Sequence, residues 1–339
     1  MRGRDLTAVG VALARFLGER WGGPVELVGL AETSAGARRG NILFDAVHPD
    51  GRRLGLVLTI PPPADTVIFG VEAEADALRL AEAVGAPVPH VHEVCPDPAL
   101  FGAPFFVSSR LEGETVPRRV LRLVDAVEGL GPRLAAQAAA ALARLHSAPA
   151  QDAPAAIRRP LDQAPCEAAL EVLAGHLEEL LAPAPTWQLA RRWLEDHQPA
   201  PPAGHRLVHG DFRTGNLVVS ADGLVGVLDW EGAHTGDPHE DLAWLCVRTW
   251  RFGNDGLEAG GFSALGPLVE AYRAAGGVFD PAAFHWWKVF GTLRWGVGLS
   301  RQAAQHLAGT TRSIVMATSG RRAAELEYDL LRLLAPAYS

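Results

Sequence analysis

Cysteine, methionine and tyrosine are scarce in this chain of 339 residues, which contains three, two and three of them, respectively. The cysteines are Cys95, Cys166 and Cys246, and no two of them have the short spacing of a metal-binding pair. An odd and sparse set of this kind excludes a disulfide framework and a structural zinc site. It is typical of a reducing compartment, so we expect a cytoplasmic protein.

The chain also lacks an excess of positive charge and any long apolar run. Its formal net charge is −8, with 31 Lys and Arg against 39 Asp and Glu, which favours no nucleic-acid partner. No apolar run reaches the roughly 20 residues that a membrane span needs, so no membrane partner is expected. The segment 1–21 carries Asp5, Arg15 and Glu19 among its apolar residues, which predicts an amphipathic helix and not a signal peptide.

Extended segments dominate the first third of the chain. Apolar runs bounded by turn residues predict strands, and one helical repeat separates the third strand from the fourth. The strands are expected over 24–32, 39–47, 54–60, 87–94 and 103–113, and the helix over 71–84. Helical periodicity dominates after that. The pattern predicts an α+β protein with a small antiparallel-sheet lobe at 1–112 and a larger, mainly helical lobe at 113–339. Ligands usually bind in clefts between lobes.

Polar residues gather in one stretch of the second lobe, LVHGDFRTGNLVVSADGLVGVLDWE (207–231). It predicts a short strand ending at His209 and then a hairpin whose midpoint falls between Asp222 and Gly223. Folding about that midpoint places Asn216 almost opposite Asp229, about 5 Å apart at Cβ. An amide oxygen and a carboxylate that close suit a hard cation such as Mg²⁺. Asp211, five residues before Asn216, could reach a substrate beside the metal without binding the metal.

An Asp, four residues, an Asn, and a second Asp after a hairpin are typical of phosphoryl-transfer catalytic loops. Together, HGDFRTGN, LDWE and GDPHEDLAWL resemble the aminoglycoside phosphotransferase and choline-kinase-like family, relatives of protein kinases. The resemblance runs from about Gly29 to the end and is strongest over 207–245. It implies a two-lobed protein-kinase-like fold that binds ATP and Mg²⁺. It also implies a role for each residue of the loop: Asp211 as catalytic base, Asn216 and Asp229 as Mg²⁺ ligands, and His209 and Asp241 as residues that hold the loop.

Within GDPHED, Asp237 is a suitable N-cap residue and Pro238 suits the first helical position. Glu240 follows Asp237 by three residues, which predicts a capping box. We therefore expect Asp237 and Glu240 to have structural roles.

The nucleotide side of the small lobe is assigned through the same resemblance. The segment TSAGARRGN (33–41) takes the place of the glycine-rich loop, which assigns Ser34, Gly36 and Arg38 to the nucleotide. Glu74 matches the family glutamate that pairs with a basic residue on a strand. Ser109 and Leu111 lie in the segment linking the lobes, where the adenine edge would meet the backbone.

One position departs from the family pattern. The resemblance places the basic strand residue at Thr59, and threonine supplies no positive charge to the phosphates. Two explanations stay open. Arg38, Arg39, Arg52 or Arg53 reaches the phosphates from a neighbouring loop, or the protein is a degenerate, non-catalytic relative. The intact Asp211, Asn216 and Asp229 favour retained catalysis.

The acceptor is indicated by an aromatic and basic set in the helical lobe between Trp244 and Trp295. Arg248 and Arg251 are three residues apart and share a helix face, which would suit an anionic acceptor. The alternative is that the tryptophans form core and the arginines are solvated. Trp230 and Glu231, which directly follow Asp229, are also assigned to the acceptor side.

The motifs look most like those of one branch of the family, the kinase domains associated with acyl-CoA dehydrogenases and the bacterial hydroxyacyl-CoA kinases. We therefore predict an ATP- and Mg²⁺-dependent small-molecule kinase that phosphorylates a hydroxyl group, with a hydroxyacyl-CoA as the favoured acceptor. An aminoglycoside, choline or sugar kinase is the alternative enzyme. A non-catalytic module that binds a nucleotide or a partner is the alternative of another class. A small protein partner and a homodimer are both left open.

Overall fold

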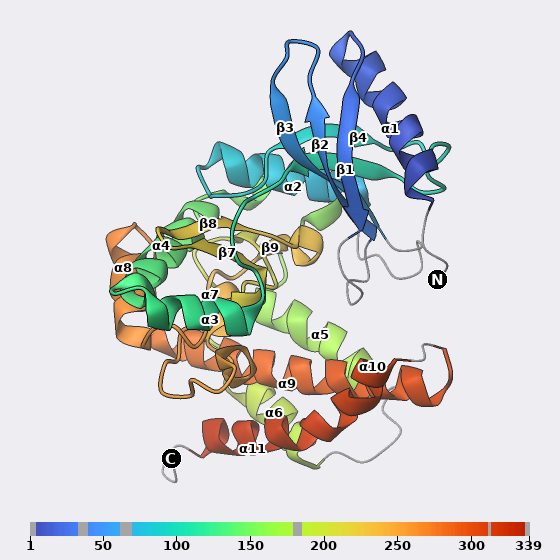
Figure 1. The fold of residues 1–339 in the computed structure, drawn as a ribbon. Coiled ribbons are helices and arrows are strands. Elements are labelled where there is room, and N and C mark those ends of the chain that lie inside the picture. Colours follow the sequence, from blue (N-terminus) through green and yellow to red (C-terminus); the bar gives the residue numbers. More distant parts are fainter. Residues whose placement is uncertain (1–4, 33–39, 62–69, 179–184, 311–312, 336–339) are drawn as a thin grey trace.

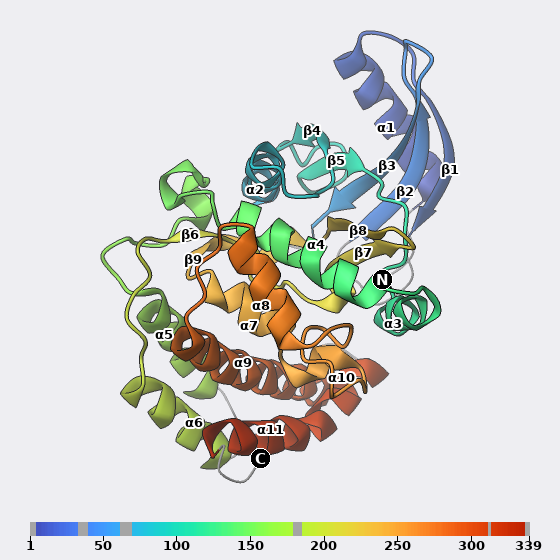
Figure 2. The ribbon, with the colours of Figure 1, turned by 90° about the vertical axis from the view of Figure 1, so that its left-hand side faces the viewer.

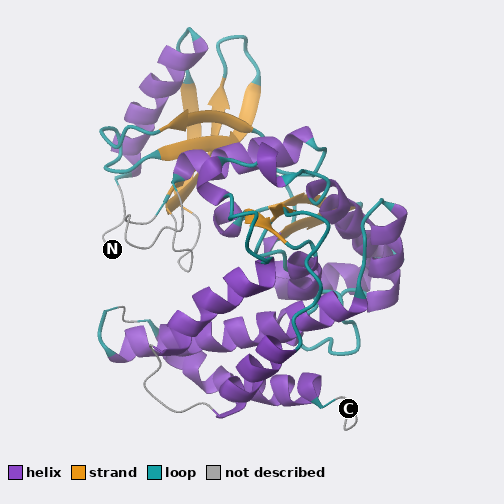
Figure 3. Ribbon diagram, turned by 180° about the vertical axis from the view of Figure 1, so that it is seen from behind, coloured by secondary structure: helices purple, strands orange, loops and turns teal. Residues whose placement is uncertain are grey.

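Two lobes make up the molecule (Figure 1). The computed structural model describes residues 5–32, 40–61, 70–178, 185–310 and 313–335. The first lobe is built on an antiparallel sheet and the second is mostly helical, which confirms the predicted fold class. Seen from behind, the long strands gather in one lobe and the helices fill the other (Figure 3). Within the described ranges, no helix is long and apolar enough to cross a membrane.

Five antiparallel strands form the sheet of the small lobe in the order β1-β2-β3-β5-β4. Their bounds are Glu26–Glu32 (β1), Gly40–Val47 (β2), Arg53–Ile60 (β3), Val91–Cys95 (β4) and Phe105–Ser109 (β5). Strand β2 shows why the sequence forms this sheet. Ile42, Phe44 and Ala46 are fully buried while the residues between them are only partly buried, the alternation of a strand with one covered face. All five strands were predicted from such runs.

A helix covers each face of this sheet. Helix α1 (Leu6–Trp21) begins where the Asp5 side chain accepts hydrogen bonds from two backbone N–H groups, and it buries Leu13 and Leu17 with the β2–β3 core. Helix α2 (Val71–Ala83) packs on β4 and β5. Its apolar cluster extends to Leu207 and Trp230 of the large lobe, so the two lobes share a continuous apolar contact.

Helix α9 (Pro281–Leu307) is the centre of the large lobe, where it packs against α7, α11 and α6. Trp286 and Trp287 on α9 are at most 1% exposed, so these two tryptophans belong to the core and not to an acceptor surface. The remaining helices are α3 (Pro117–Ala126), α4 (Leu130–Leu145), α5 (Pro165–Glu178), α6 (Pro185–Asp196), α7 (His239–Leu245), α8 (Leu265–Ala274), α10 (Ile314–Ser319) and α11 (Ala323–Leu334).

Two short strand pairs lie between the large sheet and the helices of the large lobe (Figure 2). The first joins β6 (Arg206–Val208) to β9 (His234–Gly236), and the second joins β7 (Leu217–Ser220) to β8 (Gly223–Val227). The β7–β8 hairpin was predicted. Strand β9 was missed, because His234, Thr235 and Gly236 form no apolar run, unlike Leu207 and Val208 of β6.

The chain passes between the lobes directly after β5. Glu114 pairs with Val219 of the hairpin through two backbone hydrogen bonds of 2.8 and 3.0 Å. Gly113 lies so close to this strand that a Cβ there would fall 2.7 Å from the Val218 side chain. The domain boundary expected between residues 112 and 113 falls in this crossing and stays a prediction.

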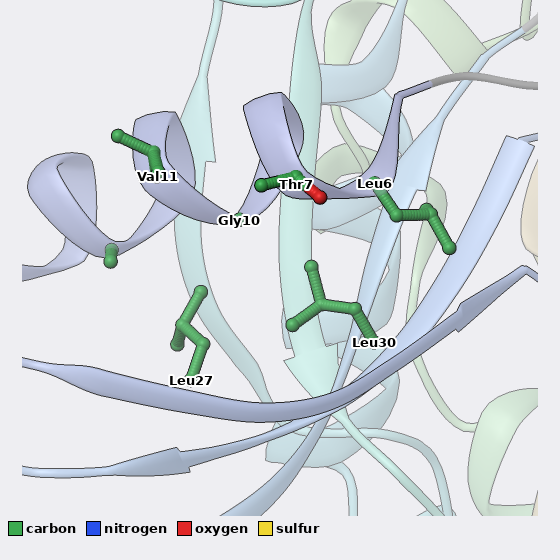
Figure 4. A pocket seen from close by; sticks show the side chains of 7 residues that line it. Leu6, Thr7, Gly10, Val11, Leu27 and Leu30 are labelled. Carbon is green, nitrogen blue, oxygen red and sulfur yellow. The ribbon is translucent and has the colours of Figure 1, made fainter.

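An apolar hollow of about 460 Å³ lies between α1 and β1 (Figure 4). Leu6, Val11, Leu27 and Leu30 line it, together with Thr7, Gly10 and Ala14. None of these side chains is charged, and none belongs to the predicted site. The hollow therefore does not contribute to the chemistry considered below.

Candidate active site

The loop after β6 turns sharply because a glycine occupies its second position. Gly210 has a φ of +77°, a conformation that favours glycine. A Cβ at this position would lie 2.2 Å from the carbonyl oxygen of Gly232, so there is no room for any side chain. The backbone of the loop is therefore in contact with the turn that follows Asp229.

Asp241, on helix α7, holds the start of this loop. Its carboxylate is fully buried and accepts hydrogen bonds from the backbone N–H groups of His209 (2.7 Å) and Gly210 (2.8 Å). His146 contacts the same carboxylate at 3.2 Å, and the other nitrogen of that ring contacts the hydroxyl of Tyr272 at 2.8 Å. This geometry agrees with the bracing role that the resemblance implies for Asp241.

His209 is fully buried, and both nitrogens of its ring are engaged. Nε2 lies 3.0 Å from the carbonyl oxygen of Leu228, and Nδ1 accepts from the backbone N–H of Asp211 at 3.2 Å. A carbonyl oxygen accepts only, so the network assigns the proton to Nε2. Burial lowers the pKa of His209 and outweighs the nearby carboxylates of Asp241 and Asp211. The ring is therefore a neutral linker between the loop and the end of β8.

Asp211 is the acidic residue that the loop presents to solvent, with its side chain 26% exposed. Trp244 Nε1 donates to Oδ1 at 2.6 Å, and Asn216 Nδ2 donates to Oδ2 at 2.8 Å. The Nε of Arg213 lies 3.1 Å from both oxygens. The carboxylate is thus held at both edges by side chains from the loop and from α7.

Asn216 and Asp229 come together as predicted, with a register that differs by one residue. The backbone N–H of Leu228 donates to the carbonyl oxygen of Asn216 at 2.8 Å, so Leu228 lies opposite Asn216 and Asp229 follows. The turn is centred one residue earlier than predicted, since Ser220 pairs with Gly223, and this alone would place Val227 opposite Asn216. The β-bulge between Val218 and Val219 moves the partner of Asn216 to Leu228. Asp229 has a φ of +67°, which Asp tolerates better than most residues.

The chemistry of these donors fits Mg²⁺. Asn216 Nδ2 donates to the backbone oxygen of Asp211 at 2.9 Å as well as to its carboxylate, so the amide oxygen points away from Asp211. Asp229, the residue after Leu228, supplies the carboxylate of the pair. Among the described residues, no group of three or more His, Cys, Asp or Glu could hold a metal ion. One carboxylate and one amide suit Mg²⁺, which usually takes its other ligands from phosphate oxygens and water.

Arg294, on α9, is a residue that sequence reasoning gave only as one of an aromatic and basic set. Its guanidinium donates to the carbonyl oxygen of Gly210 at 2.9 Å and to Glu240 at 3.0 Å, and it lies 4.0 Å from the ring centroid of Trp244. Trp244 itself was not assigned to Asp211. No local pattern could have found either contact, because 33 and 84 residues separate the partners in sequence.

The predicted capping box does not form. Asp237 accepts from the backbone N–H of His239 at 2.9 Å and so caps the start of α7, as expected. The side chain of Glu240 instead contacts His234 at 3.0 Å and accepts from Arg294. Burial alone would raise the pKa of Glu240, but His234, Arg159 and Arg294 outweigh it and lower the pKa to about 2.

The nucleotide side can be described only in part. Ser34, Gly36 and Arg38 lie outside the described residues. Glu74 is 6% exposed on α2. Ser109 ends β5, and its hydroxyl contacts His92 at 2.8 Å. Leu111 is partly buried in the crossing segment, where its side chain lies over Gly226 of β8.

The position of Thr59 limits which arginine can replace the basic strand residue of the family. Thr59 is 6% exposed near the end of β3, whereas Arg52 and Arg53 lie at the other end of that strand. Thr59 is six positions after Arg53, so their Cα atoms lie roughly 20 Å apart along the strand. The β2–β3 turn beside Arg52 lies on the side of the sheet away from the large lobe (Figure 1). Arg52 and Arg53 pair with Asp50 and Asp45, so neither serves as the replacement.

Three of the residues assigned to the acceptor need correction. Trp230 is 2% exposed, and its indole N–H donates to the carbonyl oxygen of Val227 at 3.0 Å, so it is a core residue. Arg248 pairs with Asp255 and Asp329, and Arg251 donates to the carbonyl oxygens of Asp255 and Cys246. These contacts fix the turn at 248–251. Glu231 lies in the short turn after Asp229, and its acceptor role stays a prediction.

Comparisons with known proteins identify the family and the fold of the chain. A model of the phosphotransferase enzyme family matches residues 37–287. A protein of Arabidopsis thaliana named as a probable acyl-CoA dehydrogenase is 28% identical over 70% of this chain, and human acyl-CoA dehydrogenase family member 11 is 26% identical over 66%. The matches span 32% and 30% of those two relatives, about a third of their length. The relatives are consistent with the predicted branch.

Solved structures share the fold at low sequence identity. A Ralstonia eutropha protein, assigned provisionally as an aminoglycoside phosphotransferase, has a TM-score of 0.71 at 19% identity and covers 95% of this chain and 97% of its own. A type I macrolide 2′-phosphotransferase has a TM-score of 0.63 at 22% identity, covering 94% and 96%. An aminoglycoside phosphotransferase solved with ADP and hygromycin B has a TM-score of 0.63 at 16% identity, covering 95% and 98%. At these identities the likeness shows the fold.

Proposed function

The chain belongs to the phosphotransferase enzyme family, and from that premise we propose that it transfers the γ-phosphoryl group of ATP to a hydroxyl group of a small molecule. The favoured acceptor is a hydroxyacyl-CoA. The observation that carries the proposal is the arrangement around Asp211. A partly exposed carboxylate lies between the Asn216 amide on one side and the indole N–H of Trp244 on the other.

Asp211 acts as the base in this proposal. Its carboxylate orients the acceptor hydroxyl and takes the proton as the hydroxyl oxygen bonds to the γ-phosphorus. The bond from that phosphorus to the bridging oxygen breaks, and ADP leaves with the electron pair. Arg213 is the longest and least directional of the donors to Asp211, so it is the contact that an incoming hydroxyl would replace.

Asn216 and Asp229 would hold Mg²⁺ in this proposal. The metal, when bound, neutralises charge on the phosphate oxygens. The chain prepares the ligands: the β7–β8 pairing sets Asn216 beside Asp229, and the hydrogen bonds to Asp211 fix the direction of the Asn216 amide oxygen. The nucleotides bound by fold neighbours, GDP and ADP, support a purine nucleotide as phosphoryl donor.

The charges near Asp211 support an acceptor that is not a polycation. A polycationic acceptor needs carboxylates that it can pair with. Asp211 is paired with Arg213, and Glu240 is paired with His234 and Arg294. Arg213 and Arg294 are engaged by these same carboxylates, so the preference for an acyl-CoA rests on the relatives. The names of the relatives, which are acyl-CoA dehydrogenase family members, support an acyl-CoA in the same reaction environment.

The test is Mg²⁺-dependent ATP consumption with acceptors added in sets: hydroxyacyl-CoAs, aminoglycosides, and small amino alcohols and sugars. Turnover with the hydroxyacyl-CoA set, lost in Asp211→Asn and on chelation of the metal, is the expected result. Turnover with another set would support the proposed kinase activity but would show that the acceptor is not a hydroxyacyl-CoA. ATP binding without turnover in any set would favour a non-catalytic module.

A further inference from the structure

A cluster of three tryptophans lies beside the candidate base. Trp244, Trp250 and Trp295 come from α7, the turn at 248–251 and α9, with ring centroids 4.9 to 6.4 Å apart. Trp244 and Trp250 are 4% and 5% exposed. The three indole N–H groups differ in one respect that bears on catalysis.

Trp244 Nε1 donates to Asp211 Oδ1 at 2.6 Å, the shortest of the contacts to this carboxylate. The Nε1 atoms of Trp250 and Trp295 are buried and find no hydrogen-bond partner among the residues that the structure describes. Of the three indole N–H groups in the cluster, only that of Trp244 donates to a charged group. Hydrogen bonds to charged groups are about twice as strong as neutral ones, so this contact fixes the carboxylate more firmly than ring packing does.

The indole of Trp244 is itself held in place. The Arg294 guanidinium lies 4.0 Å from its ring centroid, and the same guanidinium donates to the carbonyl oxygen of Gly210, the residue before Asp211. Trp244 is also three residues from Asp241, which braces the backbone of the same loop. One short helix thus fixes the main chain of the base loop and one edge of the base itself.

The contact from Trp244 is important because the Asp211 carboxylate has few sites that can accept hydrogen bonds. A carboxylate offers about four lone-pair sites. Trp244 and Asn216 occupy one on each oxygen, and Arg213 spans both oxygens at 3.1 Å. If an acceptor hydroxyl replaces Arg213, Trp244 and Asn216 are the donors that keep the carboxylate in place.

We propose that Trp244 is a positioning residue for phosphoryl transfer, which acts through its indole N–H on Oδ1 of Asp211. The proposal rests on the function proposed above. It concerns the orientation of the base during turnover. It assigns Trp244 no contact with ATP or with the metal.

The experiment compares Trp244→Phe with Trp295→Phe as a matched control. Both variants remove an indole N–H from the same cluster, but only the first removes a donor to Asp211. We expect kcat to fall roughly tenfold to hundredfold in Trp244→Phe, with the KM for ATP changed by less than about twofold. Trp295→Phe should stay within about threefold of wild type in both constants. Equal kcat values in the two variants would overturn the proposal.

A second measurement is independent of turnover. In a ¹⁵N–¹H spectrum the Trp244 indole signal is assigned by its loss in Trp244→Phe, and the Trp295 signal by its loss in Trp295→Phe. Asp211→Asn should move the Trp244 signal and leave the Trp295 signal in place. An unmoved Trp244 signal would remove the hydrogen bond on which the inference stands. Wild-type protein without turnover in any acceptor set would count against the proposed function, and this spectrum would still decide the contact.

Discussion

The catalytic loop of the large lobe and strand β3 of the small lobe differ in how they supply charge to the space between them. Asp211 in the loop accepts hydrogen bonds from Trp244 and Asn216, and Asp241 on α7 accepts two from the backbone of the loop. On β3, the position where the family resemblance places a cation holds the buried Thr59, and the arginine of that strand lies at its far end. The comparison indicates that the large lobe carries the chemistry, while this strand contributes apolar packing.

The largest effect should come from removing the base. In Asp211→Asn the amide cannot accept a proton, and we expect kcat to fall by roughly 10² to 10⁴. Binding of ATP should persist, which equilibrium binding can show. Activity of Asp211→Asn close to that of wild type would contradict the assignment of Asp211 as the base.

Removing the brace beneath the base should act on stability as well. Asp241→Asn leaves one oxygen to accept from His209 and Gly210, and it turns an N–H₂ group toward a backbone N–H donor. We expect the free energy of unfolding to fall by roughly 1 to 3 kcal/mol, because a buried backbone N–H loses its acceptor. Denaturant unfolding measures this. Asp255→Asn, at an exposed ion pair of Arg248, is the control and should change stability by less than about 1 kcal/mol.

The charge network behind the loop should appear in the pH dependence of stability. The pKa of Glu240 is lowered from 4.5 to about 2, so its contribution is present above pH 4.5 and is lost as pH falls toward 2. That shift corresponds to about 3 kcal/mol. We expect Glu240→Gln to be less stable than wild type at pH 7 and the difference to narrow between pH 4.5 and 2. A constant difference across that window would contradict the assignment.

The smallest effect is expected on the small-lobe side. Thr59→Val keeps the shape of the side chain and removes its hydroxyl. If β3 contributes packing and not charge, the KM for ATP should change by less than about twofold. A tenfold rise in the KM for ATP would mean that the Thr59 hydroxyl contacts the nucleotide. The two regions would then both contribute polar groups, a hydroxyl from β3 and carboxylates from the large lobe. Steady-state kinetics at saturating acceptor decides between the two.

Sequence patterns predicted much of the small lobe because its strands are apolar runs bounded by turn residues, and β2 also alternates cleanly. Ile42, Phe44 and Ala46 point to one face, and that face is buried. The phosphotransferase assignment and the two-lobed fold were also correct, since the motifs around Asp211 and Asn216 are specific. The placement of these residues near Asp229 came from a hairpin argument that set the turn one residue too late and missed the bulge.

What the sequence could not predict is which of several similar side chains makes a distant contact. Trp230 directly follows Asp229, and Trp244 lies three positions after Asp241. One lies in the core beside His209, and the other donates to the candidate base. Helical spacing is the same for a buried tryptophan and a site tryptophan, so only the packing of α7 against α9 distinguishes them. The arginines at 248 and 251 show the same ambiguity, since their partners lie in a later loop and in α11.

The close approach of Gly210 to Gly232 limits which substitutions can be inherited in the two segments. The loop that carries Asp211 and the turn that follows Asp229 meet backbone to backbone, so neither can gain volume there without displacing the other. In a saturation library selected for folded protein, position 210 should accept glycine alone. Substitutions elsewhere in either segment should survive only when they preserve this approach. Substitutions in the two halves of the site would then be inherited together, although 21 residues lie between Gly210 and Gly232 in the chain.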